Sequence, residues 1–409
     1  MSRFKLALVC FYASCCLPNF SSSQEPDPGN SKEQVAQKNE QTDDAKIVIT
    51  DNPKTVDPAT TVYEPLAKKV TVNFKESSVR EVVDWVREVS GVTVLVDEAD
   101  LADEGILLSE PVTDRLNGEP LYLILNRLQS ISLGWYVEDS ILHITTTEMA
   151  AQHLSTVPHN VGKFFDQQFD PDDLTASIID GSDPETWEDS GGTGTLILLG
   201  DVLFVRQSDE MHRKVSGLLV ALEKHGRRTF IDDPPEHEAL REKLNARVTV
   251  DFEDTPLSEA VKELATKTET DLRIDLASFR QARVREREPV SLKLTDQKLV
   301  SVLQALAAKL RLTWTLRNGV ILVTTEQTAE ALLKTAVFDV RDLSRNTDEA
   351  DALAEAIYRQ TEGQWLNLDG GPGMISFAKP GVMVVRNTEK ILGEVLIQLE
   401  NYRQALKIS

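Results

Sequence analysis

Cysteine and histidine are scarce in this chain of 409 residues. The three cysteines, Cys10, Cys15 and Cys16, lie near the N-terminus. The rest of the chain therefore has no disulfide framework and no cysteine-based metal site. No two of the six histidines have the i, i+4 spacing at which a helix presents two zinc ligands, and the nucleophile sequence G-x-S-x-G does not occur. We therefore predict a protein that is not an enzyme, with no metal and no cofactor.

Positive charge is also in short supply. The chain has 44 Lys and Arg against 66 Asp and Glu, which gives a formal net charge of −22 at pH 7. Such a surface repels the phosphates of nucleic acids and anionic lipid head groups. The composition therefore predicts no nucleic-acid partner, and membrane contact only through an N-terminal anchor.

Apart from Leu6–Ala13, the sequence lacks a long apolar run, and this one is shorter than the roughly 20 residues that a spanning helix needs. It follows the basic residues Arg3 and Lys5, as in a secretory signal, so we predict a signal peptide over residues 1–23. Cys15 follows a segment that resembles a lipoprotein cleavage box. Two alternatives stay open: lipidation at Cys15, or conventional cleavage without an anchor.

Residues 24–66 are rich in Ser, Gln, Asp, Glu, Pro and Lys and poor in large apolar residues. Such a segment buries too little surface to offset the entropy lost on ordering. We predict a disordered tether that holds the folded part away from the membrane or wall.

The folded part contains an internal repeat, and a repeat is strong evidence of architecture. Phe74, Asp97 and Trp135 in one stretch correspond to residues of the same type in a second stretch, at Phe252, Asp275 and Trp314. Apolar periodicity predicts the order β-α-β-β-α-β-β in both. We call these stretches A1 (67–155) and A2 (246–333).

A second kind of module also occurs twice, and we call its copies B1 (156–225) and B2 (334–409). Trp187 corresponds to Trp365, and the glycine loop 191–194 corresponds to 370–373. The predicted order is β-α-β-β-α. The fold class is therefore α+β, a tandem repeat of small β-α-β-β-α-type domains arranged A-B-A-B, with a charged linker over residues 226–245.

The A modules resemble the short N-terminal domain shared by secretins and TonB-dependent transducers. The resemblance rests on the strand ending at Phe74 or Phe252, the following amphipathic helix, and the closing hairpin that ends in Thr-Thr. The B modules resemble, more loosely, the ring-building domains of secretins. The resemblance implies an envelope-located interaction domain that binds other proteins or assembles side by side with its own copies.

Five residues are candidates for interaction with a partner. A tryptophan beside a loop can stack on a ligand ring, or it can cover a small core while its indole N–H is hydrogen-bonded. An arginine at a strand end can bind a carboxylate across an interface, or it can pair within its own domain. A tryptophan on a helix already tied to the core can be half exposed and available for contact. These candidates are Trp85, Trp187, Trp365, Arg206 and Arg386.

Together these features predict an exported, non-catalytic protein-protein interaction or scaffold protein of the bacterial cell envelope, in the periplasm or at the outer membrane of a diderm bacterium. It would serve as an accessory to a secretion system or as a self-assembling homo-oligomer. Two alternatives are a module that binds cell-wall glycan through Trp187 and Trp365, and an unrecognised hydrolase.

Overall fold

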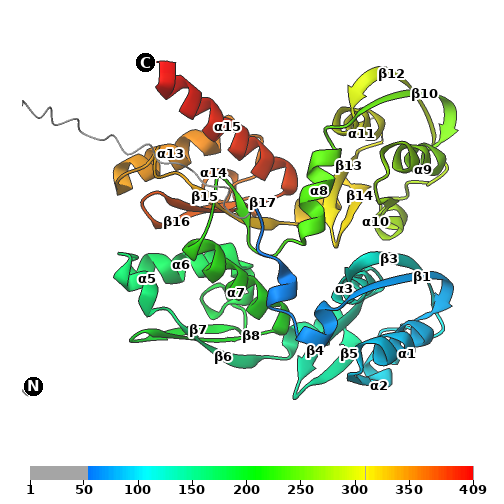
Figure 1. The fold of residues 1–409 in the computed structure, drawn as a ribbon, viewed down its shortest axis with the longest axis horizontal. Coiled ribbons are helices and arrows are strands. Elements are labelled where there is room, and N and C mark those ends of the chain that lie inside the picture. The colour runs from blue at the N-terminus through cyan, green and yellow to red at the C-terminus, as the bar shows by residue number, and fades with distance from the viewer. Residues whose placement is uncertain (1–53, 309, 409) are drawn as a thin grey trace, which may run out of the picture. The chain divides into compact units, whose positions relative to one another are not determined.

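The computed structural model describes residues 54–308 and 310–408. Helices and strands alternate through this part, which confirms the predicted α+β class (Figure 1). The predicted signal peptide, including Cys15, lies outside the described residues, as does the tether up to residue 53.

The end of the predicted tether is ordered. The 3-10 helices Pro58–Thr60 and Glu64–Ala67 lie in this segment. Val62 and Leu66 are buried in the core of A1, and Val56 is buried in the core of B1. These apolar residues, together with backbone hydrogen bonds between residues 54–56 and Phe230, attach the segment to the folded part.

A1 has the predicted order of elements, with short helices α2 and α4 in addition. Its helix α1 begins at a capping box, in which Ser78 and Glu81 bond each other's backbone N–H groups, and is followed by Gly91 at φ +73°. The elements are β1 (Lys69–Ser78), α1 (Val79–Ser90), β2 (Thr93–Val96), α2 (Glu98–Asp103), β3 (Pro111–Pro120), α3 (Tyr122–Arg127), β4 (Leu133–Glu138), β5 (Ile141–Thr146) and α4 (Thr147–Gln152).

A2 repeats A1 down to its irregularities. In A1 the β1–β3 ladder shifts register after Phe74, where Glu76 has φ +54°; in A2 the β10–β12 ladder shifts after Phe252, where Asp254 has φ +45°. The elements of A2 are β10 (Arg247–Pro256), α9 (Leu257–Thr268), β11 (Leu272–Ile274), α10 (Leu276–Gln281), β12 (Pro289–Lys298), α11 (Leu299–Ala308), β13 (Leu312–Arg317), β14 (Val320–Thr325) and α12 (Glu326–Ala331).

Each A module also has a three-stranded sheet, β2-β5-β4 or β11-β14-β13. The hairpin turns at Asp139-Ser140 and Asn318-Gly319 have positive φ at both central residues, as two-residue hairpin turns that match strand twist require. The predicted hairpins are therefore confirmed in both copies.

B1 and B2 each place helices against one face of a small antiparallel sheet. B1 contains β6 (Ser155–Asn160), α5 (Gly162–Asp166), α6 (Pro171–Gly181), β7 (Thr195–Leu199), β8 (Val202–Gln207) and α7 (Asp209–Glu223). B2 contains β15 (Lys334–Asp339), α13 (Thr347–Gln360), α14 (Leu366–Asp369), β16 (Met374–Lys379), β17 (Val382–Asn387) and α15 (Glu389–Ile408).

The segment predicted as a linker is structured in part. Its strand β9 (Thr229–Phe230) pairs with β15 and extends the B2 sheet to the order β16-β17-β15-β9. Its helix α8 (Pro235–Lys243) contributes Leu240 to the core of A2. The linker therefore adds structure to the second pair of modules.

B1 and B2 share a core. Val337, Val382 and Val384 of the B2 sheet lie in one apolar cluster with Ile178 of α6 and Leu218 of α7. The helices of B1 therefore lie between two sheets, their own and that of B2, while α13 and α15 cover the other face of the B2 sheet (Figure 1).

Two glycines allow this close packing. A Cβ on Gly181 would lie 3.2 Å from a methyl of Val384, and a Cβ on Gly217 would lie 1.9 Å from the carbonyl oxygen of Ile231. The first contact could be relieved by small shifts, but the second is with backbone. Helix α7 can approach the chain after β9 only because residue 217 has no side chain.

We expect Gly217→Ala to lower the free energy of unfolding by about 1–3 kcal/mol, because the new methyl forces helix and backbone apart. The matched control is Gly393→Ala in α15, where a Cβ would meet nothing within 4 Å. There we expect a gain of up to about 1 kcal/mol from the better helix propensity of alanine. Urea unfolding measures the free energy of unfolding of both variants. An equal change in the two would contradict the explanation that Gly217 is needed for close packing.

Candidate interaction surface and the junctions around it

The two predicted loop tryptophans lie in the cores. The side chain of Trp187 is 1% exposed and that of Trp365 is fully buried. The Trp187 indole donates to the Ser182 carbonyl at 3.1 Å, and the Trp365 indole donates to the Thr361 hydroxyl at 3.1 Å. Their rings contact the protein itself, and neither presents a face on which a ligand could stack.

Trp85 is half-buried on α1, with its ring edge-on to Phe74 at a centroid distance of 5.3 Å. One side of the indole therefore packs on the A1 core, and part of the side chain is accessible from outside.

Arg386 makes an ion pair between the two B modules. It is 7% exposed, and its Nε and Nη2 donate to Oδ1 of Asp183 in B1, at 3.2 and 2.8 Å. Burial would raise the pKa of Asp183, but the charges of Lys214 and Arg386 overcome it and hold the pKa at about 2. The predicted carboxylate partner therefore exists, and it belongs to the other B module of the same chain.

Arg206, which corresponds to Arg386, is exposed and bonds only a carbonyl oxygen, that of Thr193 at 3.4 Å, within the described part of the chain. It lies on the side of the B1 sheet that faces away from α6 and α7. Cross-strand pairs place Pro158, Phe204 and Ile197 in one row and Asn160, Val202 and Leu199 in the next. We call these residues, with Thr156, Arg206 and Thr195 in the third row, the outer B1 face.

The outer B1 face is apolar at its centre and open. Leu199 is 70% exposed, Ile197 59% and Phe204 37%. Its nine residues include no carboxylate, although the whole chain is strongly acidic. In B2 the corresponding positions on β15 and β17, Val337, Val382 and Val384 among them, are almost fully buried under the helices of B1, and those on β16 are half-buried.

Arg206 was predicted from the sequence as an interaction residue, but the apolar residues around it were not. Their alternation with the buried Leu203 and Val205 was a usable signal that Val202, Phe204 and Arg206 share one face. That no other module of the chain covers this face is visible only in the assembled structure.

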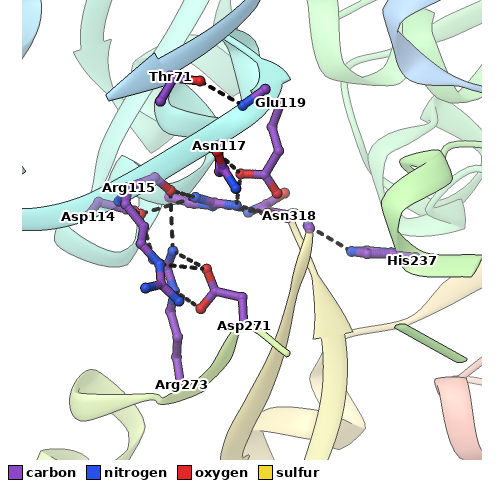
Figure 2. Close-up of polar contacts among 12 residues, drawn as sticks. Thr71, Asp114, Arg115, Asn117, Glu119, His237, Asp271, Arg273 and Asn318 are labelled. Carbon is purple, nitrogen blue, oxygen red and sulfur yellow. Dashed lines mark hydrogen bonds and ion pairs between the residues drawn. The ribbon is translucent and has the colours of Figure 1, made fainter. Parts of the chain in front are cut away.

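A polar network joins A1 to A2 (Figure 2). Arg273 of A2 binds Asp271 through two hydrogen bonds of 2.8 Å and also reaches Asp114 of A1. In return, Arg127 of A1 donates to the carbonyl oxygen of Asn318 in A2, at 2.9 and 2.7 Å. Burial would raise the pKa of Asp271, but Arg273 and Arg115 hold it below its usual range.

The same hairpin turn is bound from the other side by His237 of α8 (Figure 2). The backbone N–H of Gly319 donates to Nε2 of His237 at 2.8 Å. Nε2 must therefore be unprotonated, and Nδ1 donates to Asp233 at 2.7 Å. Burial lowers the pKa of His237 against the pull of Asp233, which agrees with a neutral ring.

Asp233 also connects this turn to B2. Lys334 of β15 contacts it at 2.7 Å and Arg241 of α8 at 2.8 Å, and both of these cations also pair with Glu389 at the start of α15. Phe230 lies under the guanidinium of Arg241, at 3.9 Å from the ring centroid. The predicted linker thus carries a buried charge cluster that holds A2 and B2 together.

Within the residues that the structure describes, no helix is both long and apolar enough to cross a bilayer. In the same part of the chain, no three His, Cys, Asp or Glu side chains are grouped so as to hold a metal ion.

No protein-family model and no curated protein matches the chain. Among solved structures it is similar to XcpQN012, with 15% identity and a TM-score of 0.16, over 49% of this chain and 79% of that one. It is also similar to the N-terminal domain of the secretin XcpQ from Pseudomonas aeruginosa, with 15% identity and a TM-score of 0.15, over 48% and 76%. A third structure is the GspC–GspD complex of the enterotoxigenic Escherichia coli type II secretion system, with 13% identity and a TM-score of 0.15, over 38% and 98%.

We expect Arg386→Ala to lower the free energy of unfolding by about 2–3 kcal/mol, because it leaves Asp183 buried with one cation fewer. The corresponding change in the other B module, Arg206→Ala, should alter it by less than about 0.5 kcal/mol, since that side chain is exposed. Chemical denaturation of both variants tests this, and an equal loss would show that Arg386 gains nothing from its burial.

His237 should make stability depend on pH. The folded protein holds His237 neutral, so below about pH 6.5 unfolding takes up a proton there and stability falls as the pH drops. We expect His237→Gln to lower stability at pH 8 but to flatten its decline between about pH 6.5 and 5, because glutamine cannot be protonated. Urea unfolding at several pH values measures the slope, and a slope equal to that of the parent chain would contradict the prediction.

Proposed function

We propose that the protein is a non-catalytic docking subunit, exported to the bacterial cell envelope, whose outer B1 face binds another protein. The observation that supports this most directly is the contrast between two equivalent faces. In B2 the part of the face on β15 and β17 is buried under two helices of the same chain; in B1 no described residue covers the face, and Ile197 and Leu199 are more than half exposed. Open apolar patches of this kind mark interaction sites.

The buried contact between B1 and B2 indicates what such a partner presents. Apolar helix residues, Ile178 and Leu218, cover the valines of the B2 sheet, and Asp183 receives Arg386 at its margin. Arg206 stands at the corresponding margin of the outer B1 face. We infer a partner with an apolar helical surface and a carboxylate placed to meet Arg206.

A second copy of this chain fits that description poorly. Ser208 precedes α7 and Thr388 precedes α15. Gly217 and Ile397 each lie nine residues after these positions, so they correspond. Leu218 corresponds to Gln398 in the same way. The helical surface of B2 is therefore bulkier and more polar than that of B1, so this contact does not repeat from copy to copy in the same geometry.

The favoured partner is therefore a distinct protein. We place this contact in a secretion-related assembly of the envelope, because the A modules resemble secretin and TonB-associated domains. Glycan binding through Trp187 and Trp365 is not supported, because both rings are buried.

A test is site-specific photo-crosslinking in the native host. We expect a crosslinker at Ile197 or Phe204 to give an adduct with one protein of the envelope, and Arg206→Glu to reduce its yield because the partner's carboxylate is then repelled. The control positions are Leu107 and Ile397, which are about as exposed as Ile197 but lie elsewhere. Adducts of equal yield at all four positions, or none at the outer B1 face, would refute the proposal.

A further inference from the structure

A cavity of about 320 Å³ lies where A1, B1, A2 and B2 meet the linker. Its wall includes Gln129 of A1, Lys214 of α7, Asp232 and Asp233 after β9, Arg317 of β13 and Lys334 of β15. We call it the junction cavity. Its volume is at the lower end of the range of small-molecule sites in proteins.

Most charged residues of this wall are satisfied by one another. Each of the following makes an ion pair within 4.0 Å: Asp183, Glu185, Glu210, Arg213, Lys214, Asp233, Lys334 and Arg386. These side chains do not need a ligand as a charge partner, because each already has one within the protein.

Two charged residues of the wall differ. Asp232, which is partly buried, makes no hydrogen bond or ion pair with its side chain among the described residues. Arg317, also partly buried, has no carboxylate partner among them and donates only to the side-chain oxygen of Gln129, at 3.2 Å. The same cavity is thus lined by one carboxylate and one guanidinium that have no ion-pair partner among the described residues.

Nearby charges compensate these two groups only in part. Burial raises the pKa of Asp232 in spite of the nearby Arg213 and Lys214. Burial likewise lowers the pKa of Arg317, in spite of Glu210 and Asp275. A charge that is partly removed from water without a partner is costly, and side chains with a perturbed pKa in a cavity are candidates for a binding site.

The cavity wall is also partly apolar. It includes the apolar residues Phe230, Ile231, Leu316, Leu332 and Leu333. A cavity lined by a carboxylate, a guanidinium and apolar side chains suits a molecule with an ammonium group, a carboxylate and an aliphatic body. The guanidinium can bind a carboxylate with two parallel hydrogen bonds.

We propose that the junction cavity binds a small zwitterion of the α-amino-acid class, with its ammonium on Asp232 and its carboxylate on Arg317. Because residues of all four modules line the cavity, the bound ligand stabilises their arrangement. This site is separate from the outer B1 face, and either proposal can fail without the other.

The test uses the folded chain, isothermal titration calorimetry and thermal unfolding. The probes are L-leucine and L-alanyl-L-alanine, with 4-methylpentanoate and 3-methylbutylamine as the two halves of leucine that each keep one charge. We expect at least one zwitterion to bind and to raise Tm, and each half to bind at least tenfold more weakly. Failure of both zwitterions at millimolar concentration would overturn the proposal.

Variants then locate the site. Asp232→Asn and Arg317→Gln should each weaken zwitterion binding at least tenfold, whereas the surface changes Asp348→Asn and Arg345→Gln should leave it unchanged. Without ligand, the first two should keep or raise Tm, because each removes a partly buried charge that has no ion-pair partner. A fall in Tm for both would mean that Asp232 and Arg317 are structural, and unchanged affinity would place binding elsewhere; either result contradicts the proposal.

Discussion

The contact on which the rest of the structure depends is the burial of the B2 sheet under the helices of B1. Val337, Val382 and Val384 lose their contact with water there, and Gly181 and Gly217 let the layers approach. The hydroxyl of Thr335 also donates to the carbonyl of Gly181 at 2.8 Å, so the end of α6 is hydrogen-bonded where it meets the sheet. This apolar contact joins the two B modules through one shared core, and among the described residues nothing covers the matching surface, the outer B1 face.

Two further contacts that join modules are polar. A1 meets A2 through Arg127, Asp114 and Arg273, and the linker joins A2 to B2 through Asp233 and His237. Ion pairs and hydrogen bonds fix geometry more than they add stability, because each charge gives up water to form them. The apolar contact between B1 and B2 therefore supplies most of the stability between modules, and the polar contacts fix how the modules are oriented. The junction cavity lies where the two kinds of contact meet.

Much of the fold could be predicted from the sequence because its signals are local. The alternation in Val70–Phe74, the helical spacing of Val79, Val82 and Val86, and the Asn318-Gly319 turn each specify an element through contacts within a few residues. The candidate site could be predicted only in part. Phe204 and Val384 stand at equivalent points of strands with nearly the same pattern, and nothing local distinguishes the open one from the buried one.

By itself, the sequence determined the kinds of module, their duplication and their order, because hydrophobic period and turn residues act over short range. Only the tertiary structure decided which faces meet. The partner of Arg386 is Asp183, far away in the chain, and Asp232 and Arg317 share a cavity because four modules close around it. Such pairings depend on how preformed surfaces fit in space, and periodicity along one segment carries no information about the surface that will lie opposite.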